Sequence, residues 1–175
     1  VKGDFQRHLH FPTQLLGLLG TTFLVCYGIG LLFSGSIGAR FGNKAVASVG
    51  LAATAAVLAA HGCLSKGWLG APPTSADEAW AQGLSLYVPL VAVNGFVQSL
   101  GFPNLVAVTS GWVAPTQRGL VLGLWSTTGA AGDIIGLNVA TAVLEGGVEW
   151  QTVFFAVSGY LGAMTIVLWV CVQDS

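Results

Sequence analysis

The chain has 175 residues, of which 54% are hydrophobic and only 7% are charged, and its formal net charge is -1. Because an ordinary soluble domain carries about 25% charged residues, this composition excludes water as the solvent for most of the chain and indicates an integral membrane protein. The six Lys and Arg residues are scattered, which excludes the clustered basic surface that binding to nucleic acid requires.

Five long apolar runs follow one another along the chain. A helix needs about 20 apolar residues to cross a bilayer, and a backbone inside lipid must satisfy its hydrogen bonds internally. We therefore predict an all-α fold, a polytopic transmembrane helix bundle that forms a single domain over residues 1–175. The predicted spans cover approximately residues 15–38, 45–64, 84–113, 119–144 and 152–172.

The connections between these runs differ in length and charge. Residues 39–44 and 114–118 are short connections, whereas residues 65–83 are a longer one that contains Asp77 and Glu78. Successive connections must alternate sides of the membrane. The rule that cytoplasmic loops carry more cations then does not determine the orientation, because each side holds three Lys and Arg residues. One side has Arg40, Lys44 and Arg118, and the other has Lys2, Arg7 and Lys66. The short connections, whose cations face no acid, are the better cytoplasmic candidates.

The first short connection belongs to a glycine-rich stretch, GSIGARFGNK, at residues 35–44. Gly35, Gly38 and Gly42 allow tight packing or a sharp turn. Arg40 and Lys44 can reach anionic headgroups or the carbonyl end of the preceding helix. Interfacial anchoring accounts for both cations without any further role.

Pairs of small residues recur four positions apart, a spacing that lets helix backbones approach one another closely. The pairs are Gly38 and Gly42, Ala52 and Ala56, Gly132 and Gly136, and Gly159 and Ala163. They predict helices that pack on one another and support the architecture without indicating an activity.

Polar side chains in the middle of the spans are the candidates for a solute site. In the third span Asn94 and Gln98 are four residues apart and therefore share a helix face. Two amides there could bind a hydroxyl- or phosphate-bearing solute, or could bond to neighbouring helices. Pro89 and Pro103 predict kinks in the same helix, either static or involved in bending.

The fourth span contains a carboxylate, Asp133, on the helix face of Ser126 and Gly129, with Trp125 and Thr128 beside it. A carboxylate at membrane depth is costly and usually faces a bundle interior or a water-filled path, so Asp133 is a functional candidate. A protonated or hydrogen-bonded structural carboxyl is the alternative. Tyr27 in the first span could contact a solute or could simply be a packed aromatic residue.

No set of residues points to chemistry beyond binding. Cys26, Cys63 and Cys171 are odd in number and widely spaced, which indicates neither a disulfide framework nor a metal site. Asp133 stands alone at membrane depth, and His61 has no evident catalytic partner. We expect no enzymatic activity, no catalytic residues, no metal and no cofactor.

Two stretches resemble a known transporter family. Residues 35–44 are similar to the loop between the second and third helices of Major Facilitator Superfamily transporters, through Gly35, Arg40, Gly42 and Lys44. Residues 94–136 resemble the fourth helix, the following loop and the fifth helix of the sugar-phosphate exchangers, within the organophosphate:phosphate antiporter family. Residues 23–35 resemble their second helix.

The resemblance implies that the five spans are helices two to six of a twelve-helix transporter, most of its amino-terminal half without the first helix. It implies a secondary active transporter that exchanges a sugar phosphate or glycerol phosphate for inorganic phosphate by alternating access. By the same resemblance we expect it in the endoplasmic reticulum membrane. The partners are then the phosphorylated solute, inorganic phosphate, the lipid bilayer and the missing helices. The implied substrate-binding residues are Tyr27, Asn94, Gln98, Trp125, Thr128 and Asp133, and the implied gating residues are Gly35, Arg40, Gly42, Lys44 and Arg118.

The chain departs from the family pattern at several positions. Ala39 stands where the loop pattern has its Asp, and neither Thr128 nor Gly129 is the His that the family carries in this helix. The family's main anion-binding Arg lies on the first helix, before Val1. These departures keep an alternative open, a non-transporting membrane scaffold or an inactive truncated transporter fragment.

Overall fold

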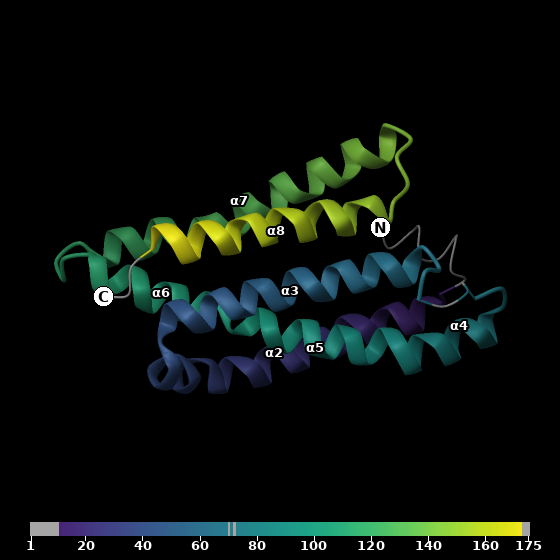
Figure 1. The fold of residues 1–175 in the computed structure, drawn as a ribbon, viewed down its shortest axis with the longest axis horizontal. Coiled ribbons are helices and arrows are strands. Elements are labelled where there is room, and N and C mark those ends of the chain that lie inside the picture. Colours follow the sequence, from purple (N-terminus) through teal and green to yellow (C-terminus); the bar gives the residue numbers. More distant parts are fainter. Residues whose placement is uncertain (1–10, 70, 72, 173–175) are drawn as a thin grey trace.

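The computed structural model describes residues 11–69, 71 and 73–172, and within them every regular element is a helix (Figure 1). Among these described residues, five helical spans are long and apolar enough to cross a membrane, which confirms the all-α class. Lys2 and Arg7, two of the cations counted above for orientation, lie outside the described residues.

Most of the spans are single helices. The exception is the third, in which four consecutive elements form one rod from Ala76 to Trp112. In chain order the elements are α2 (Thr13–Phe41), α3 (Asn43–Ser65), α4 (Ala76–Gln82), the π-helix η1 (Gly83–Tyr87), α5 (Val88–Ser99), α6 (Gly101–Trp112), α7 (Arg118–Glu145) and α8 (Thr152–Cys171).

The third span begins earlier than residue 84, because Asp77 and Glu78 belong to the first turn of α4 rather than to a loop. The Ser75 hydroxyl accepts a hydrogen bond from the Glu78 N–H at 3.2 Å, and the Glu78 carboxylate accepts bonds from the Thr74 N–H and hydroxyl at 2.8 Å each. Acids near a helix N-terminus are favourable. The arrangement resembles a capping box, in which the Glu side chain bonds to the N–H of the N-cap residue, but Glu78 bonds instead to Thr74, one residue before the N-cap Ser75. The two carboxylates therefore start a helix that the sequence pattern placed later.

The two prolines of this rod have different consequences. Pro103 has no N–H to donate to the Ser99 carbonyl. The helix is interrupted nearby, at Leu100, whose N–H donates a hydrogen bond to the Val97 carbonyl at 3.2 Å. Pro89 lies in the first turn of α5, directly after Val88, whose N–H bonds to the Gly83 carbonyl of η1. Only Pro103 accompanies an interruption between two α-helices.

The helices pack unequally. α2 lies against α5, and α3 contacts α5 and α6 as well as α8, whereas the main contact of α7 is with α6 (Figure 1). One hydrophobic cluster lies near the end of the bundle where α3 ends and α8 begins. It is formed by Phe11, Leu15, Leu64, Ala79, Tyr87 and Trp150.

The backbones of α2 and α5 touch at Gly95. A Cβ atom built at Gly95 would lie 2.5 Å from the Phe23 carbonyl oxygen and 3.1 Å from the Tyr27 nitrogen. Since no side chain larger than hydrogen fits between backbones at this distance, Gly95 sets how far Tyr27 on α2 lies from α5.

The connection that the sequence predicts at residues 39–44 is a single residue in the structure. Arg40 lies in the last turn of α2 and Lys44 in the first turn of α3, and only Gly42 separates the two helices. Gly42 has a φ of 90°, which disfavours residues with a side chain, and its N–H donates to the Gly38 carbonyl at 2.9 Å.

Candidate functional site

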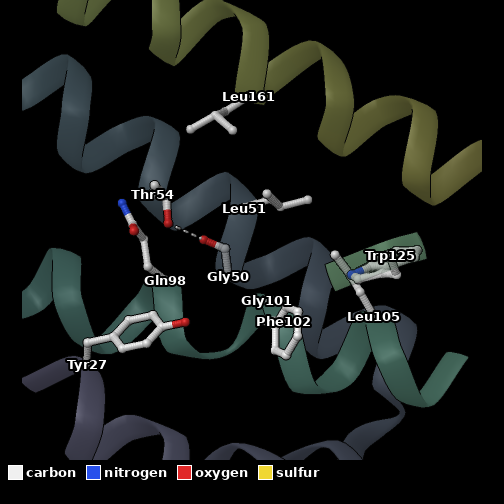
Figure 2. Close-up of a pocket in the computed structure, with 10 residues that line it drawn as sticks. All are labelled: Tyr27, Gly50, Leu51, Thr54, Gln98, Gly101, Phe102, Leu105, Trp125 and Leu161. Atoms are coloured by element: carbon white, nitrogen blue, oxygen red, sulfur yellow. Dashed lines mark hydrogen bonds between the residues drawn. The ribbon is translucent and has the colours of Figure 1, made fainter. Parts of the chain in front are cut away.

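A pocket of about 400 Å³ lies at the interruption between α5 and α6 (Figure 2). Residues of six helices line it, so that segments far apart in the sequence contribute to one wall. They are Tyr27 of α2, Gly50, Leu51 and Thr54 of α3, Gln98 of α5, Gly101, Phe102 and Leu105 of α6, Trp125 of α7 and Leu161 of α8.

Four side chains give the pocket its polar groups. Figure 2 shows the Tyr27 hydroxyl projecting from α2 toward the middle of the pocket, with Gln98 and Thr54 above it. A Tyr hydroxyl donates and accepts hydrogen bonds, a Gln amide does both, and the Trp125 indole N–H only donates. The Thr54 hydroxyl donates to the Gly50 carbonyl at 2.8 Å, which leaves its oxygen available as an acceptor.

The rest of the pocket wall is formed by the apolar side chains of Leu51, Phe102, Leu105 and Leu161. The lining residues include neither a cation nor a carboxylate. The arrangement can hold a group that combines apolar faces with a few hydroxyls, but its own side chains provide no charge to neutralise a phosphate.

Asn94 is not among the residues that line the pocket. It is 9% exposed, and its Oδ1 accepts a long hydrogen bond of 3.4 Å from Gln98 Nε2. Gln98 thus lines the pocket, whereas the bond between the two amides lies within α5 and not between neighbouring helices.

On α7 the structure brings only Trp125 to the pocket. The Thr128 hydroxyl is exposed and donates to the Trp125 carbonyl in its own helix at 2.6 Å. Asp133 is also exposed and lies eight residues beyond Trp125, or about 12 Å along the helix axis. Thr128 and Asp133 are therefore not assembled with Tyr27 and Gln98 by the described residues.

The five candidate gating residues have different surroundings. Gly35 is exposed and has open space where a side chain would be. The Arg40 guanidinium carbon lies 5.5 Å from the centre of the Phe41 ring, and Lys44 Nζ lies 5.1 Å from the centre of the Trp169 ring on α8. Arg118 Nε donates to the Val113 carbonyl at 3.3 Å and closes the turn before α7.

A buried polar contact between α2 and α6 was not among the predicted site residues. Asn104 is 1% exposed, and its Nδ2 donates to the Ser34 hydroxyl at 3.0 Å and to the Leu100 carbonyl at 2.7 Å. Gly38 packs against the Asn104 amide, where no Cβ atom would fit. Asn104, and Thr54 in the pocket, are polar residues inside apolar runs, so the rule that selected Asn94 and Gln98 could have selected both.

Comparison with known proteins gives a consistent set of relatives. The sequence model of the Major Facilitator Superfamily matches residues 2–174. Sugar phosphate exchanger 3 of Homo sapiens is 36% identical over 154 residues, which are 88% of this chain and 29% of that protein. Glucose-6-phosphate exchanger SLC37A1 of Mus musculus is 32% identical over 154 residues, 88% of this chain and 26% of that protein.

A plant protein, putative glycerol-3-phosphate transporter 3 of Arabidopsis thaliana, is 29% identical over 143 residues, 81% of this chain and 25% of that protein. The chain thus spans between a quarter and a third of the length of these relatives. No solved structure matches the chain significantly. Because the superfamily model covers almost all of the residues, the chain belongs to the Major Facilitator Superfamily.

Proposed function

We propose that the full-length protein containing these residues is a secondary active transporter that exchanges a sugar phosphate or glycerol phosphate for inorganic phosphate. Alternating access around a site between helices needs no chemical step, so we expect transport without enzymatic activity, catalytic residues, metal or cofactor. The observation that carries the proposal is the similarity to exchangers of phosphorylated solutes over 88% of the chain. The endoplasmic reticulum membrane is the proposed location.

Within this function, the pocket would hold the uncharged part of the solute. Sugars and glycerol present hydroxyls together with C–H surfaces, and such groups suit Tyr27, Gln98 and Trp125 beside Phe102. Asn94 would orient the Gln98 amide through their hydrogen bond. Arg and Lys form the strongest charge-assisted hydrogen bonds to phosphate, and we propose that such a group reaches the solute from outside the pocket wall.

Thr128 and Asp133 would contribute to the solute path from the exposed side of α7. The gating residues would act at the helix ends. Gly42 provides the sharp turn, Lys44 ties α3 to α8, and Arg118 closes the turn before α7. Gly35 offers an open surface for a further helix, and Arg40 an exposed cation.

Uptake into vesicles containing the full-length protein tests the exchange. Labelled glucose 6-phosphate and glycerol 3-phosphate are offered outside, with or without inorganic phosphate inside. We expect uptake that is much faster with internal phosphate. Equal uptake in both cases would remove the exchange mechanism, and no uptake of either solute would favour the non-transporting scaffold.

The role of the pocket has a separate test, Gln98→Leu. Loss of about 1.4 kcal/mol of hydrogen bonding to a solute hydroxyl corresponds to a tenfold higher half-saturation concentration for the sugar phosphate. The exchange of phosphate for phosphate should be unchanged, because phosphate alone does not use the pocket. Gln14→Leu, at an exposed position of α2, is the matched control. Equal effects on both solutes would contradict the division between sugar and phosphate.

A further inference from the structure

An apolar groove of about 300 Å³ lies between the end of α2 and the start of α3, apart from the pocket described above. Val46 and Leu100, 6% and 9% exposed, are its most buried lining residues. Phe41 and Val49 stand at its edges and are 65% and 62% exposed. The remaining lining residues are Ile37 and Ala45.

Since α2 and α3 are candidate membrane spans that end and begin beside Gly42, we expect the groove to lie at the membrane interface. Phe41 is the last residue of α2, and Val49 lies six residues into α3, about 9 Å along its axis. The groove therefore extends from the helix ends, where polar headgroups would be, toward the hydrocarbon.

Positive charge lies at the interfacial end of the groove. Arg40 is exposed, and its guanidinium carbon is 5.5 Å from the ring of the groove residue Phe41. The first turn of α3 contains no acidic residue and no side-chain cap, so the positive end of its dipole adds to the same field.

No carboxylate neutralises this charge within the described part of the chain. Residues 11–65, which include all of α2 and α3, contain no Asp or Glu. Across the described residues, the ion pair between Lys66 and Glu149 joins the end of α3 to the segment before α8 and does not involve Arg40. Among the described residues, Arg40 thus has no anion beside it, and the groove next to Arg40 is lined by apolar side chains.

We propose that this groove binds an anionic phospholipid, with one acyl chain along Phe41 and Val49 and the headgroup phosphate and carboxylate at Arg40. A zwitterionic lipid can supply the chain but not the net negative charge. A soluble phosphate can supply the charge but not the apolar contact. A single basic residue near a membrane surface contributes about 1 kcal/mol of attraction to anionic lipid, which is about a fivefold preference over phosphatidylcholine.

Photolabelling of the full-length protein in phosphatidylcholine bilayers tests the proposal. The probes are phosphatidylserine and phosphatidylcholine that carry the same photoreactive group on one acyl chain, added at equal mole fraction. We expect phosphatidylserine to label the segment around residues 37–49 about fivefold more than phosphatidylcholine. Because labelling is measured without solute flux, its result is independent of the proposed transport.

Three variants identify the groups responsible. Arg40→Ala should abolish the preference, and Arg40→Lys should retain it, since Lys keeps the charge. Val49→Trp, at an exposed edge position, should fill the groove and reduce labelling by both lipids. Arg118→Ala removes an exposed cation from the other short connection and should leave labelling of residues 37–49 unchanged.

Three results would overturn the proposal. Equal labelling by both lipids would mean that the groove contacts bulk lipid without selecting a headgroup. Labelling by neither would mean that protein covers the groove. Loss of labelling when inorganic phosphate is added, at constant ionic strength, would assign Arg40 to a soluble anion.

Discussion

Two helices of similar character, α3 and α7, have opposite environments. They contain 23 and 28 residues, and both are apolar enough to cross a membrane. Half of the most apolar stretch of α3 is buried inside the bundle, whereas none of the corresponding stretch of α7 is. Hydropathy reports which solvent a helix prefers, and lipid and a neighbouring helix are equally apolar, so it cannot tell these two helices apart.

The surroundings of the glycines differ between α3 and α7 in the same way. A Cβ atom at Gly50 of α3 would lie 3.0 Å from the Val97 carbonyl, while a Cβ atom at Gly132 or Gly136 of α7 would meet nothing within 4 Å. A glycine spacing therefore marks a helix contact only where a second helix is present. The four predictions below measure how far the packed and exposed regions differ, and all of them use the full-length protein.

The largest effect is expected for an added methyl group at the crossing of α2 and α5. Gly95→Ala would place a carbon 2.5 Å from the Phe23 carbonyl oxygen, and overpacking of this kind typically costs about 1–3 kcal/mol. Gly132→Ala on α7 should not destabilise the protein, since Ala has the higher helix propensity. Thermal unfolding in detergent measures both variants, and equal melting temperatures would show that the α2–α5 crossing is looser than described.

The second comparison removes an amide from each region. Asn104→Leu should lower the free energy of unfolding by about 1–2 kcal/mol, because the buried Ser34 hydroxyl loses its donor. Asn138→Leu on α7 should change it by less than about 0.5 kcal/mol, since its side chain is exposed and bonds to Ile134 of the same helix. Denaturant titration distinguishes them. A larger loss at Asn138 would mean that α7 is packed in the full-length protein.

The third prediction concerns the carboxylate of the exposed helix. Asp133→Asn should leave membrane insertion intact and change stability by less than about 0.5 kcal/mol, because Asp133 is exposed. It should slow the exchange, because the proposed solute path loses a carboxylate. Exchange in vesicles is the measurement, and an unchanged rate would remove Asp133 from the proposed solute path.

The smallest effect is expected at the ion pair between Lys66 Nζ and Glu149 Oε2, which are 2.9 Å apart. The Glu149 side chain is 69% exposed, and exposed pairs contribute about 0–1 kcal/mol. Glu149→Gln should therefore lower the melting temperature only slightly, and less at high salt. A loss as large as that of Gly95→Ala would show that this pair holds α8 against α3.

The predictable part of the site came from polar residues inside apolar runs. Tyr27, Gln98 and Trp125 were selected in this way, and all three line one pocket. Thr54 is a polar residue inside an apolar run and could have been selected by the same rule, whereas Leu161 could not, because nothing in the local pattern shows that α3 and α8 meet there. Thr128 and Asp133 lie on the same helix as Trp125, but neither of them lines the pocket.

Helix boundaries were harder to predict than helices. The acids at residues 77 and 78 were expected in a loop, although Ser75 and Glu78 have the S-x-x-E spacing of a helix N-terminus, and the bonds among Thr74, Ser75 and Glu78 place them at the start of α4. The six-residue connection at 39–44 proved to be a single turn residue, Gly42. Hydrogen bonds at helix ends depend on geometry that residue types alone do not specify.

The amino-acid sequence by itself determined that the chain forms apolar helices, because a backbone in lipid must satisfy its own hydrogen bonds wherever about 20 apolar residues follow one another. It also selected the polar side chains that those helices carry. Only the tertiary structure decided which helices touch, and so which polar groups share a pocket and which cation stands beside an apolar groove. The physical reason is that association of helices in lipid depends on the shape of the contact and on hydrogen bonds between helices, not on hydrophobicity, which is nearly the same on every face.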